Sequence, residues 1–270
     1  ALADLIVTSL GDDLILRIAG TEDRVTLDRT LNSVFYRIES VVFDDETELD
    51  HAALVALALA GTEADQRLDG SSDGEVIDGL GGNDSIYGKD GADTLMGGSG
   101  NDFLRGGQGN DEYRFDPGFG QDTVSDGGLR TTDTVRFGPG IDPADLIVTG
   151  NGEDLILRIA GTEDRITLDR TLNSAFYRIE SVAFDDGSTL NHTELLAMAI
   201  AGTDADQRID GSGDADAIDG LGGNDAIYGL AGDDTLTGGE GNDFLSGGRD
   251  DDTYVFEAGF GQDIVSDAFS

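Results

Sequence analysis

An apolar residue recurs every nine positions over two long tracts of the sequence, and most residues between are glycine or aspartate. With lines of nine counted from Gly61 and from Gly202, position eight is apolar or tyrosine in all fourteen lines. The stretch GLGGNDSIYGKDGADTLM, which begins at Gly79, shows this period through Ile86 and Leu95. Such a strict period argues against a flexible glycine-rich linker, which needs no apolar register.

Each line predicts one short strand and one turn. Three residues around the apolar position form the strand, and six glycine-rich residues form the turn, because glycine tolerates positive φ and close backbone approach. Two lines complete one coil of a parallel β-helix, so each line stacks on the second line after it at a spacing of roughly 4.8 Å. The position-eight side chains then fill a thin core.

The segments before the two tracts alternate apolar and polar residues or run apolar, as strands do. In the second segment DTVRF, DLIVT, EDLILRIA, DRITLD and FYRIESVAF predict strands, with turns at GNGED and DDGSTL. The first turn predicts a hairpin. A helix is predicted over Leu195–Ala201, because LLAMAIA follows the capping-box pattern Asn191-x-x-Glu194, and over the equivalent Leu54–Ala60 after Asp50.

The whole pattern repeats at an offset of 141 residues: DLILRIAGTEDR occurs at Asp13–Arg24 and again at Asp154–Arg165. The sequence therefore predicts an all-β chain with two copies of one unit. Each copy has a small antiparallel β-rich segment, one short capping helix and a parallel β-helix (β-roll). The predicted bounds are 1–60 and 127–201 for the β-rich segments with their helices, and 61–126 and 202–270 for the β-rolls. Because DTVRFGPGIDP has no counterpart before Ala1, we expect further copies in the parent protein.

Position six of the lines is acidic in nearly every line. It is Asp in eleven lines, Glu in one (Glu75) and Gln in two (Gln66 and Gln207). Stacked carboxylates would repel one another, and a hard divalent cation between successive coils would remove that repulsion. The 56 acidic and 16 basic residues give a formal charge of −40, which excludes nucleic acid and anionic membranes as partners and favours cations.

Cysteine content and the length of apolar runs exclude further classes of protein. There is no cysteine, which excludes a disulfide framework and thiol chemistry. No run of 18 apolar residues predicts a membrane span. This composition is compatible with an extracellular bacterial protein that relies on metal for its stability.

The lines resemble the G-G-x-G-x-D-x-U-x calcium-binding repeats of the RTX (repeats-in-toxin, haemolysin-type) family. GGSGNDFLR and GLGGNDSIY fit this pattern nearly fully, and the resemblance covers Gly61–Ser125 and Gly202–Ser266. The β-rich segment, with its DTVRFGPGIDPADL entry, resembles the domain often found beside such repeats in large secreted bacterial proteins.

The family pattern implies Ca²⁺ between each line and the second line after it. Position-six carboxylates of both lines would bind it, with backbone carbonyls near positions two and four of the first line and one and three of the second. The implied carboxylate ligands are Glu75, Asp84, Asp93, Asp102, Asp111, Asp122, Asp216, Asp225, Asp234, Asp243, Asp252 and Asp263. The implied backbone ligands include Gly82, Gly91, Gly97, Gly106, Gly223, Gly232, Gly238 and Gly247. The pair count and ligand number predict about three to five ions per unit.

Several residues depart from the pattern. Gln66 and Gln207 carry no charge, so each opening line is expected to be a cap. Asp214 and Asp250 replace glycine at position four and are expected to distort the turns of the second copy. The helix LLAMAIA is expected to cover the open end of the β-helix rather than to bind a membrane.

The resemblance implies a calcium-dependent structural module that leaves a Gram-negative cell unfolded through a type I exporter and folds outside. One alternative is an adhesin or carbohydrate-binding array on a cell surface or in a matrix. Another is the non-catalytic C-terminal part of a secreted enzyme. No catalytic residue is predicted, since H-E-x-x-H and G-x-S-x-G are absent and the only histidines, His51 and His192, stand at helix starts.

Overall fold

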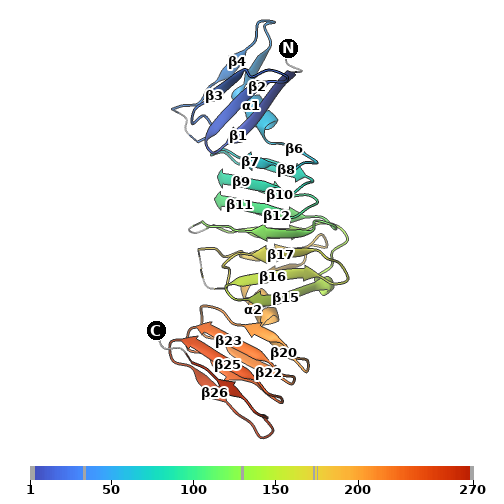
Figure 1. The fold of residues 1–270 in the computed structure, drawn as a ribbon, viewed down its shortest axis with the longest axis vertical. Coiled ribbons are helices and arrows are strands. Elements are labelled where there is room, and N and C mark those ends of the chain that lie inside the picture. The colour runs from blue at the N-terminus through green and yellow to red at the C-terminus, as the bar shows by residue number, and fades with distance from the viewer. Residues whose placement is uncertain (1–3, 33–34, 129–130, 173, 175, 268–270) are drawn as a thin grey trace. The chain divides into compact units, whose positions relative to one another are not determined.

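The computed structural model describes residues 4–32, 35–128, 131–172, 174 and 176–267. The chain divides into two compact units, Ala1–Gly140 and Ile141–Ser270. In each unit a β-rich segment is followed by one helix and then by a stack of short parallel strands (Figure 1).

The first unit begins with antiparallel strands and continues into the β-roll. Its β-rich segment contains β1 (Leu5–Leu10), β2 (Asp13–Ile18), β3 (Arg24–Leu27), β4 (Ser40–Val42), β5 (Glu48–Asp50) and α1 (His51–Ala58). Its β-roll contains β6 (Ala60–Thr62), β7 (Arg67–Asp69), β8 (Val76–Leu80), β9 (Ser85–Asp90), β10 (Thr94–Met96), β11 (Phe103–Gln108), β12 (Glu112–Phe115), β13 (Gln121–Val124) and β14 (Thr134–Phe137).

The second unit repeats this order. Its β-rich segment contains a 3-10 turn (Pro143–Asp145), β15 (Leu146–Asn151), β16 (Asp154–Ile159), β17 (Arg165–Leu168), β18 (Ser181–Ala183), β19 (Thr189–Asn191) and α2 (His192–Ala199). Its β-roll contains β20 (Ala201–Thr203), β21 (Arg208–Asp210), β22 (Ala217–Leu221), β23 (Ala226–Ala231), β24 (Thr235–Thr237), β25 (Phe244–Arg249), β26 (Thr253–Val255) and β27 (Ile264–Val265).

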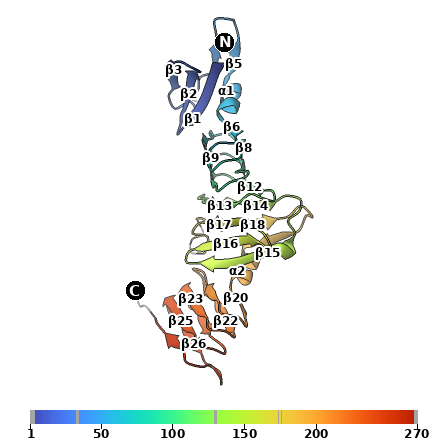
Figure 2. The same ribbon diagram turned by 45° about the vertical axis from the view of Figure 1, so that its right-hand side comes forward.

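The nine-residue period becomes two parallel ladders in the first β-roll (Figure 2). Even-numbered strands β6 to β14 form one ladder, and odd-numbered strands β7 to β13 form the other. Ile86 pairs in register with Leu68 and Leu104, and Leu95 pairs with Ile77. Each of these position-eight side chains is buried. The predicted parallel β-helix, in which each line stacks on the second line after it, is confirmed.

The second β-roll has the same register. Ile227 pairs with Ile209 and Leu245, and Leu236 pairs with Ile218. These five residues form one continuous buried cluster. The buried apolar core of the second β-roll is thus a single column of side chains from each ladder.

The structure corrects the placement of DTVRF, which was predicted to open the second β-rich segment. It forms β14, which pairs in parallel with β12 and places Val135 opposite Tyr113 in the first β-roll. Phe137 packs on Phe115 and Phe119, with ring centroids 6.3 Å from each. The stretch between β13 and β14 is longer than a turn of the nonapeptide pattern, and that length hid the period from sequence reasoning.

The predicted hairpins are present. β15, β16 and β17 form an antiparallel sheet, and β18 pairs with β19, as do their counterparts β1 to β3 and β4 with β5. FYRIESVAF was predicted as one strand, but only its residues 181–183 are extended and paired as β18.

Both helices begin earlier and end earlier than predicted. Asn191 and Glu194 form the predicted capping box, which makes His192 rather than Leu195 the first helical residue. Residue Ala201, predicted as helical, begins β20 instead. α1 is likewise capped by Asp50, whose side chain accepts from the Ala53 N–H at 2.8 Å. No helix in the described part of the chain is long and apolar enough to span a membrane.

One buried aspartate ties each β-rich segment to its own β-roll. In the first unit β1 contacts β7, and the Asp69 carboxylate at the end of β7 accepts from Gly11 N–H at 2.9 Å. Arg67 donates two hydrogen bonds to the same carboxylate, and the Asp69 N–H donates to Ser9 Oγ at 2.7 Å. Asp210 repeats this arrangement in the second unit, accepting from Gly152 N–H at 3.1 Å. Sequence reasoning missed this role.

We expect Asp69→Ala to loosen the junction between the β1–β2 hairpin and the first coil. The change leaves the half-buried Gly11 N–H without its acceptor and removes the ion pair with Arg67, so we expect a loss of about 1–3 kcal/mol. Urea unfolding in saturating calcium measures it. The control is Asp28→Ala at an exposed ion pair, where a change within about 0.5 kcal/mol is expected. Equal effects of both variants would contradict the anchoring role.

Candidate metal centre

The position-six side chains form hydrogen-bonded ladders along each β-roll. In every step, one carboxylate oxygen accepts from the backbone N–H of the position-six residue two lines earlier; Asp102 Oδ1 accepts from Asp84 N–H at 2.7 Å. In the first unit the ladders run Gln66, Asp84, Asp102, Asp122 and Glu75, Asp93, Asp111, Asp133. In the second unit they run Gln207, Asp225, Asp243, Asp263 and Asp216, Asp234, Asp252.

The second oxygen of most of these carboxylates makes no hydrogen bond among the described residues and is buried. These Oδ2 atoms belong to Asp84, Asp93, Asp102, Asp111, Asp225, Asp234, Asp243, Asp252 and Asp263. Burying a carboxylate oxygen without a partner costs far more than a hydrogen bond returns. Carboxylate oxygens are the donor type that Ca²⁺ takes. The residues present therefore fit a hard divalent cation.

Glycine at position one keeps open the space that most of these Oδ2 atoms occupy. A Cβ on Gly97 would overlap Asp102 Oδ2, and a Cβ on Gly106 would overlap Asp111 Oδ2. The same relation holds in the second unit for Gly238 and Gly247. These four are among the glycines predicted to supply backbone ligands, and the structure sets them directly beneath the carboxylates.

The other predicted backbone contributors stand at position four. Gly82 and Gly91 have φ of +100° and +117°, and Gly223 and Gly232 have φ of +109° and +106°. Glycine adopts this left-handed region without strain. The turn that carries the carboxylates therefore depends on glycine at both positions, one for its φ and one for its lack of a side chain.

Burial sets the electrostatics of the ladders. Burial, together with nearby carboxylates, raises the pKa of Asp93 and of Asp234 to about 7 and that of Asp111 to about 6. Burial likewise raises the pKa of Asp102 and Asp225. A carboxylate that binds protons this readily is one whose charge lacks a counter-ion in its immediate surroundings.

The ladder ends differ from the middle. Glu75 Oε2 accepts from Ser71 N–H at 3.1 Å, and Asp216 Oδ2 accepts from Ser212 N–H at 2.6 Å, so serine satisfies the second carboxylate oxygen. Gln66 Oε1 accepts from the Thr62 N–H of its own turn at 2.6 Å. At the far end the two-residue insertion preserves the stack, because Asp122 Oδ1 accepts from Asp102 N–H at 2.8 Å.

The aspartates at position four are accommodated. Asp250 takes a φ of +74°, and its Oδ2 accepts from Gly232 N–H at 3.3 Å. The Asp214 N–H donates to Ser212 Oγ at 3.2 Å. The ladder continues past both residues to Asp252.

Sequence reasoning missed a second ladder at position five. Asn101 N–H donates to Asn83 Oδ1 at 2.9 Å, and Gln121 N–H donates to Asn101 Oδ1 at 3.1 Å. Here the earlier line accepts from the later one, opposite to the aspartate ladder. The recurring Asn-Asp pair at positions five and six was the available signal. Asp133 was missed as well, because it lies beyond the last regular line.

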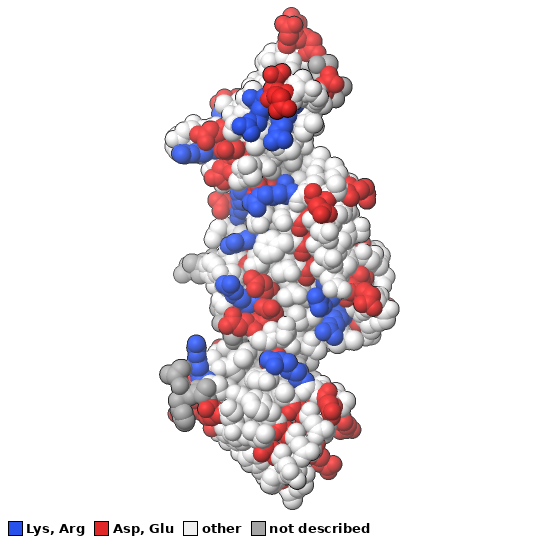
Figure 3. Space-filling view, in the orientation of Figure 1, with Lys and Arg blue, Asp and Glu red and all other residues white. Residues whose placement is uncertain are grey.

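Other polar residues serve structural roles in the described chain. Burial, with the nearby Arg178 charge, lowers the pKa of His192 to about 4, so this imidazole stays neutral at the start of α2. Arg37 pairs with Asp73 at 2.9 Å, and the Arg67 guanidinium lies over the Tyr87 ring at 4.1 Å from its centroid. On the face shown in Figure 3, carboxylates lie over both units.

Both parts of each unit match known protein families. Residues 69–104, 87–124, 201–236, 220–254 and 228–265 match the RTX calcium-binding nonapeptide repeat (4 copies). Residues 13–53 and 154–194 match the haemolysin-type calcium binding protein related domain. The two families alternate along the chain in the order of the β-rich segments and β-rolls.

Individual relatives are longer than this chain. It is 34% identical over 102 residues to the iron-regulated protein FrpA of Neisseria meningitidis serogroup C, a match that covers 36% of this chain and 9% of FrpA. It is also similar to the crystal structure of extracellular lipase LipA from Serratia marcescens, with 19% identity and a TM-score of 0.26 over 74% of this chain and 30% of the lipase.

We expect Gly238→Ala to weaken calcium binding in the second β-roll, because the new Cβ would occupy the place of Asp243 Oδ2. The matched control is Gly222→Ala in the same β-roll, where the nearest atom would lie 3.6 Å away. Calcium titration followed by circular dichroism should show at least a tenfold loss of apparent affinity for the first variant only. Equal midpoints for the two variants would contradict this geometry.

We expect acid to stabilise the metal-free fold. The folded-state pKa of Asp93 and Asp234, about 7, lies above the unfolded value, so folding binds protons between about pH 4 and pH 7. Stability without calcium is then greatest at low pH and falls as the pH rises through 7. Calcium competes with these protons, so its affinity should rise over the same window. Circular dichroism in chelator at pH 5 and pH 8 checks this, and equal β-content at both would contradict it.

Proposed function

Since the chain carries RTX calcium-binding nonapeptide repeats and the related domain beside them, as the sequence predicted, we propose that it is a calcium-binding structural module of a secreted bacterial protein. The observation that carries this proposal is the row of buried Oδ2 atoms, eight of which are held over a position-one glycine. Such a row is costly in a metal-free protein and becomes favourable when a divalent cation binds it.

We propose that the module folds on binding calcium. Without the ion, a formal charge of −40 opposes compaction, and 41 glycines add to the conformational entropy lost on folding. The single column of apolar side chains in each ladder offers limited burial to offset these terms. The free energy of calcium binding then becomes free energy of folding.

The proposed sites lie between position-six carboxylates two lines apart. The central pairs are Asp84 with Asp102, Asp93 with Asp111, Asp225 with Asp243, and Asp234 with Asp252. The proposed end pairs are Glu75 with Asp93, Asp216 with Asp234, Asp102 with Asp122, and Asp243 with Asp263. Because serine already binds Glu75 and Asp216, those two end sites should be the weakest. This proposal gives about three to five ions per unit.

The location proposed for the module is outside the cell. Calcium-dependent folding suits a chain exported unfolded by a type I system from a calcium-poor cytoplasm into a calcium-rich medium. The module itself is proposed to be non-catalytic. Any catalytic or adhesive activity, and any polysaccharide or cell-surface ligand, would belong to the parent protein.

The test is a comparison of the full chain in calcium and in chelator. We expect weak β-signal and no cooperative thermal transition in chelator at pH 7.5, and a strong β-signal with a cooperative transition in millimolar calcium. Magnesium at equal concentration is the control, and it should not substitute, because it demands octahedral geometry and keeps its waters. If the chain in chelator shows the same β-signal and the same melting temperature as the chain in calcium, the proposal is wrong.

A further inference from the structure

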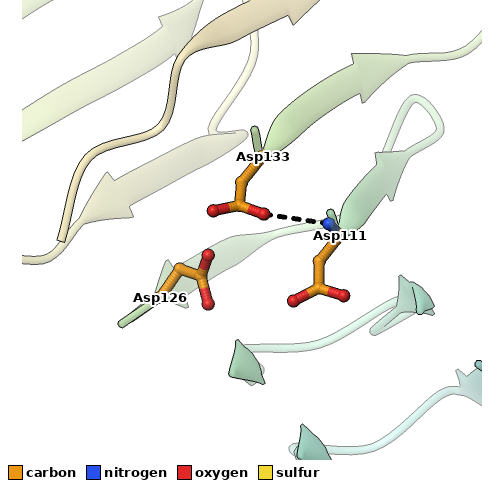
Figure 4. A group of neighbouring side chains, drawn as sticks. All are labelled: Asp111, Asp126 and Asp133. Carbon is orange, nitrogen blue, oxygen red and sulfur yellow. Dashed lines mark hydrogen bonds between the residues drawn. The ribbon is translucent and has the colours of Figure 1, made fainter. Parts of the chain in front are cut away.

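Three carboxylates converge at the closing end of the first β-roll. Asp111 precedes β12, Asp126 follows β13 and Asp133 precedes β14, and Figure 4 shows their side chains gathered together. One oxygen from each lies within 4.8 Å of the others. All three residues are buried, with 1–2% of their surface exposed.

The backbone fixes one oxygen of each outer carboxylate. Asp133 Oδ1 accepts from Asp111 N–H and Asp126 Oδ1 accepts from Gly107 N–H, each at 2.9 Å. The remaining Oδ2 atoms of Asp111 and Asp126 are buried and make no hydrogen bond among the described residues. Asp111 and Asp126 therefore each bring to the cluster a buried carboxylate oxygen that makes no hydrogen bond among the described residues.

This cluster does not follow the nonapeptide pattern. Asp126 stands at position one of the line that would follow Ser125, where the preceding regular lines place glycine. Asp133 follows Asp111 by 22 residues, four more than the regular stacking interval. The repeat families matched by the chain end at residue 124 in this unit, so both aspartates lie outside them.

We propose that Asp111, Asp126 and Asp133 bind an additional calcium ion that fastens β14 to the preceding strands β12 and β13 of the first β-roll. Oxygens within 4.8 Å of one another can share an ion whose Ca–O distances are about 2.3–2.6 Å. Three carboxylates give this site more negative charge than a position-six pair provides, which favours a hard cation further. This inference rests on the proposed function only in taking calcium as the ion.

The second unit provides a matched comparison. Asp252 and Asp267 are the counterparts of Asp111 and Asp126, and Asp267 Oδ1 accepts from Gly248 N–H at 3.4 Å. Among the described residues, however, a group of three such carboxylates occurs only at the closing end of the first β-roll. Asp267 therefore offers a control position at which the described residues form no group of three carboxylates.

The experiment counts calcium ions bound by the full chain and by two variants, using equilibrium dialysis. Asp126→Asn removes one charge but keeps an oxygen that can accept from Gly107 N–H. We expect it to lose one bound ion, or to weaken one site at least tenfold. Asp267→Asn is the control, and its ion count and affinities should match those of the unchanged chain.

The outcomes separate this inference from the proposed function. Calcium binding by the unchanged chain, together with an Asp126→Asn variant of equal count and affinity, would overturn the additional site alone. A chain that binds no calcium would overturn the proposed function. If Asp126→Asn does not fold in saturating calcium, the same count of bound ions is made on Asp133→Asn. The amide oxygen of that variant can still accept from Asp111 N–H.

Discussion

Mutual repulsion between buried carboxylates, stacked one above another along each ladder, is the constraint on which the rest of the structure depends. In the middle of each ladder, an Asp such as Asp102 accepts from the backbone of an earlier line through one oxygen and directs the other toward a position-one glycine. A shift in the register of the ladder would break the hydrogen bonds to the backbone N–H groups. The charge on the carboxylates is neutralised only when a cation or a proton binds the second oxygen. In the function we propose, glycine content, acidity and the thin core all serve one requirement, a coil that folds on binding cations.

The regular part of the fold could be predicted because its rule is local. Nine residues specify one strand and one turn, and Ile86 and Leu95 are buried where this period places them. The position-six carboxylates could be assigned as candidates by the same rule. Their opposed oxygens, one bonded to a backbone N–H and one directed toward a position-one glycine, follow from three-dimensional stacking and required the structure.

The misses have physical causes as well. Asp69 was overlooked because its partners are Ser9 and Gly11, which are distant in sequence and carry no motif. β14 and Asp133 were misplaced because a longer connection interrupts the period before them. The early helix starts follow from caps at Asp50 and Asn191, whose hydrogen bonds outweigh the apolar composition that suggested later starts. Sequence periodicity fails at the places where the coil begins and ends.

The opposite directions of the two neighbouring ladders have a mechanical consequence. At position six the later line grips the earlier one, as in the bond from Asp84 N–H to Asp102, while at position five Asn83 of the earlier line grips Asn101 of the later one. Adjacent coils are thus linked in both directions beside the pairs Asp84 with Asp102 and Asp102 with Asp122. Tension along a β-roll would act on these side-chain hydrogen bonds and on the metal–oxygen bonds together. Bound calcium would then determine the tensile stiffness of the β-roll as well as its shape.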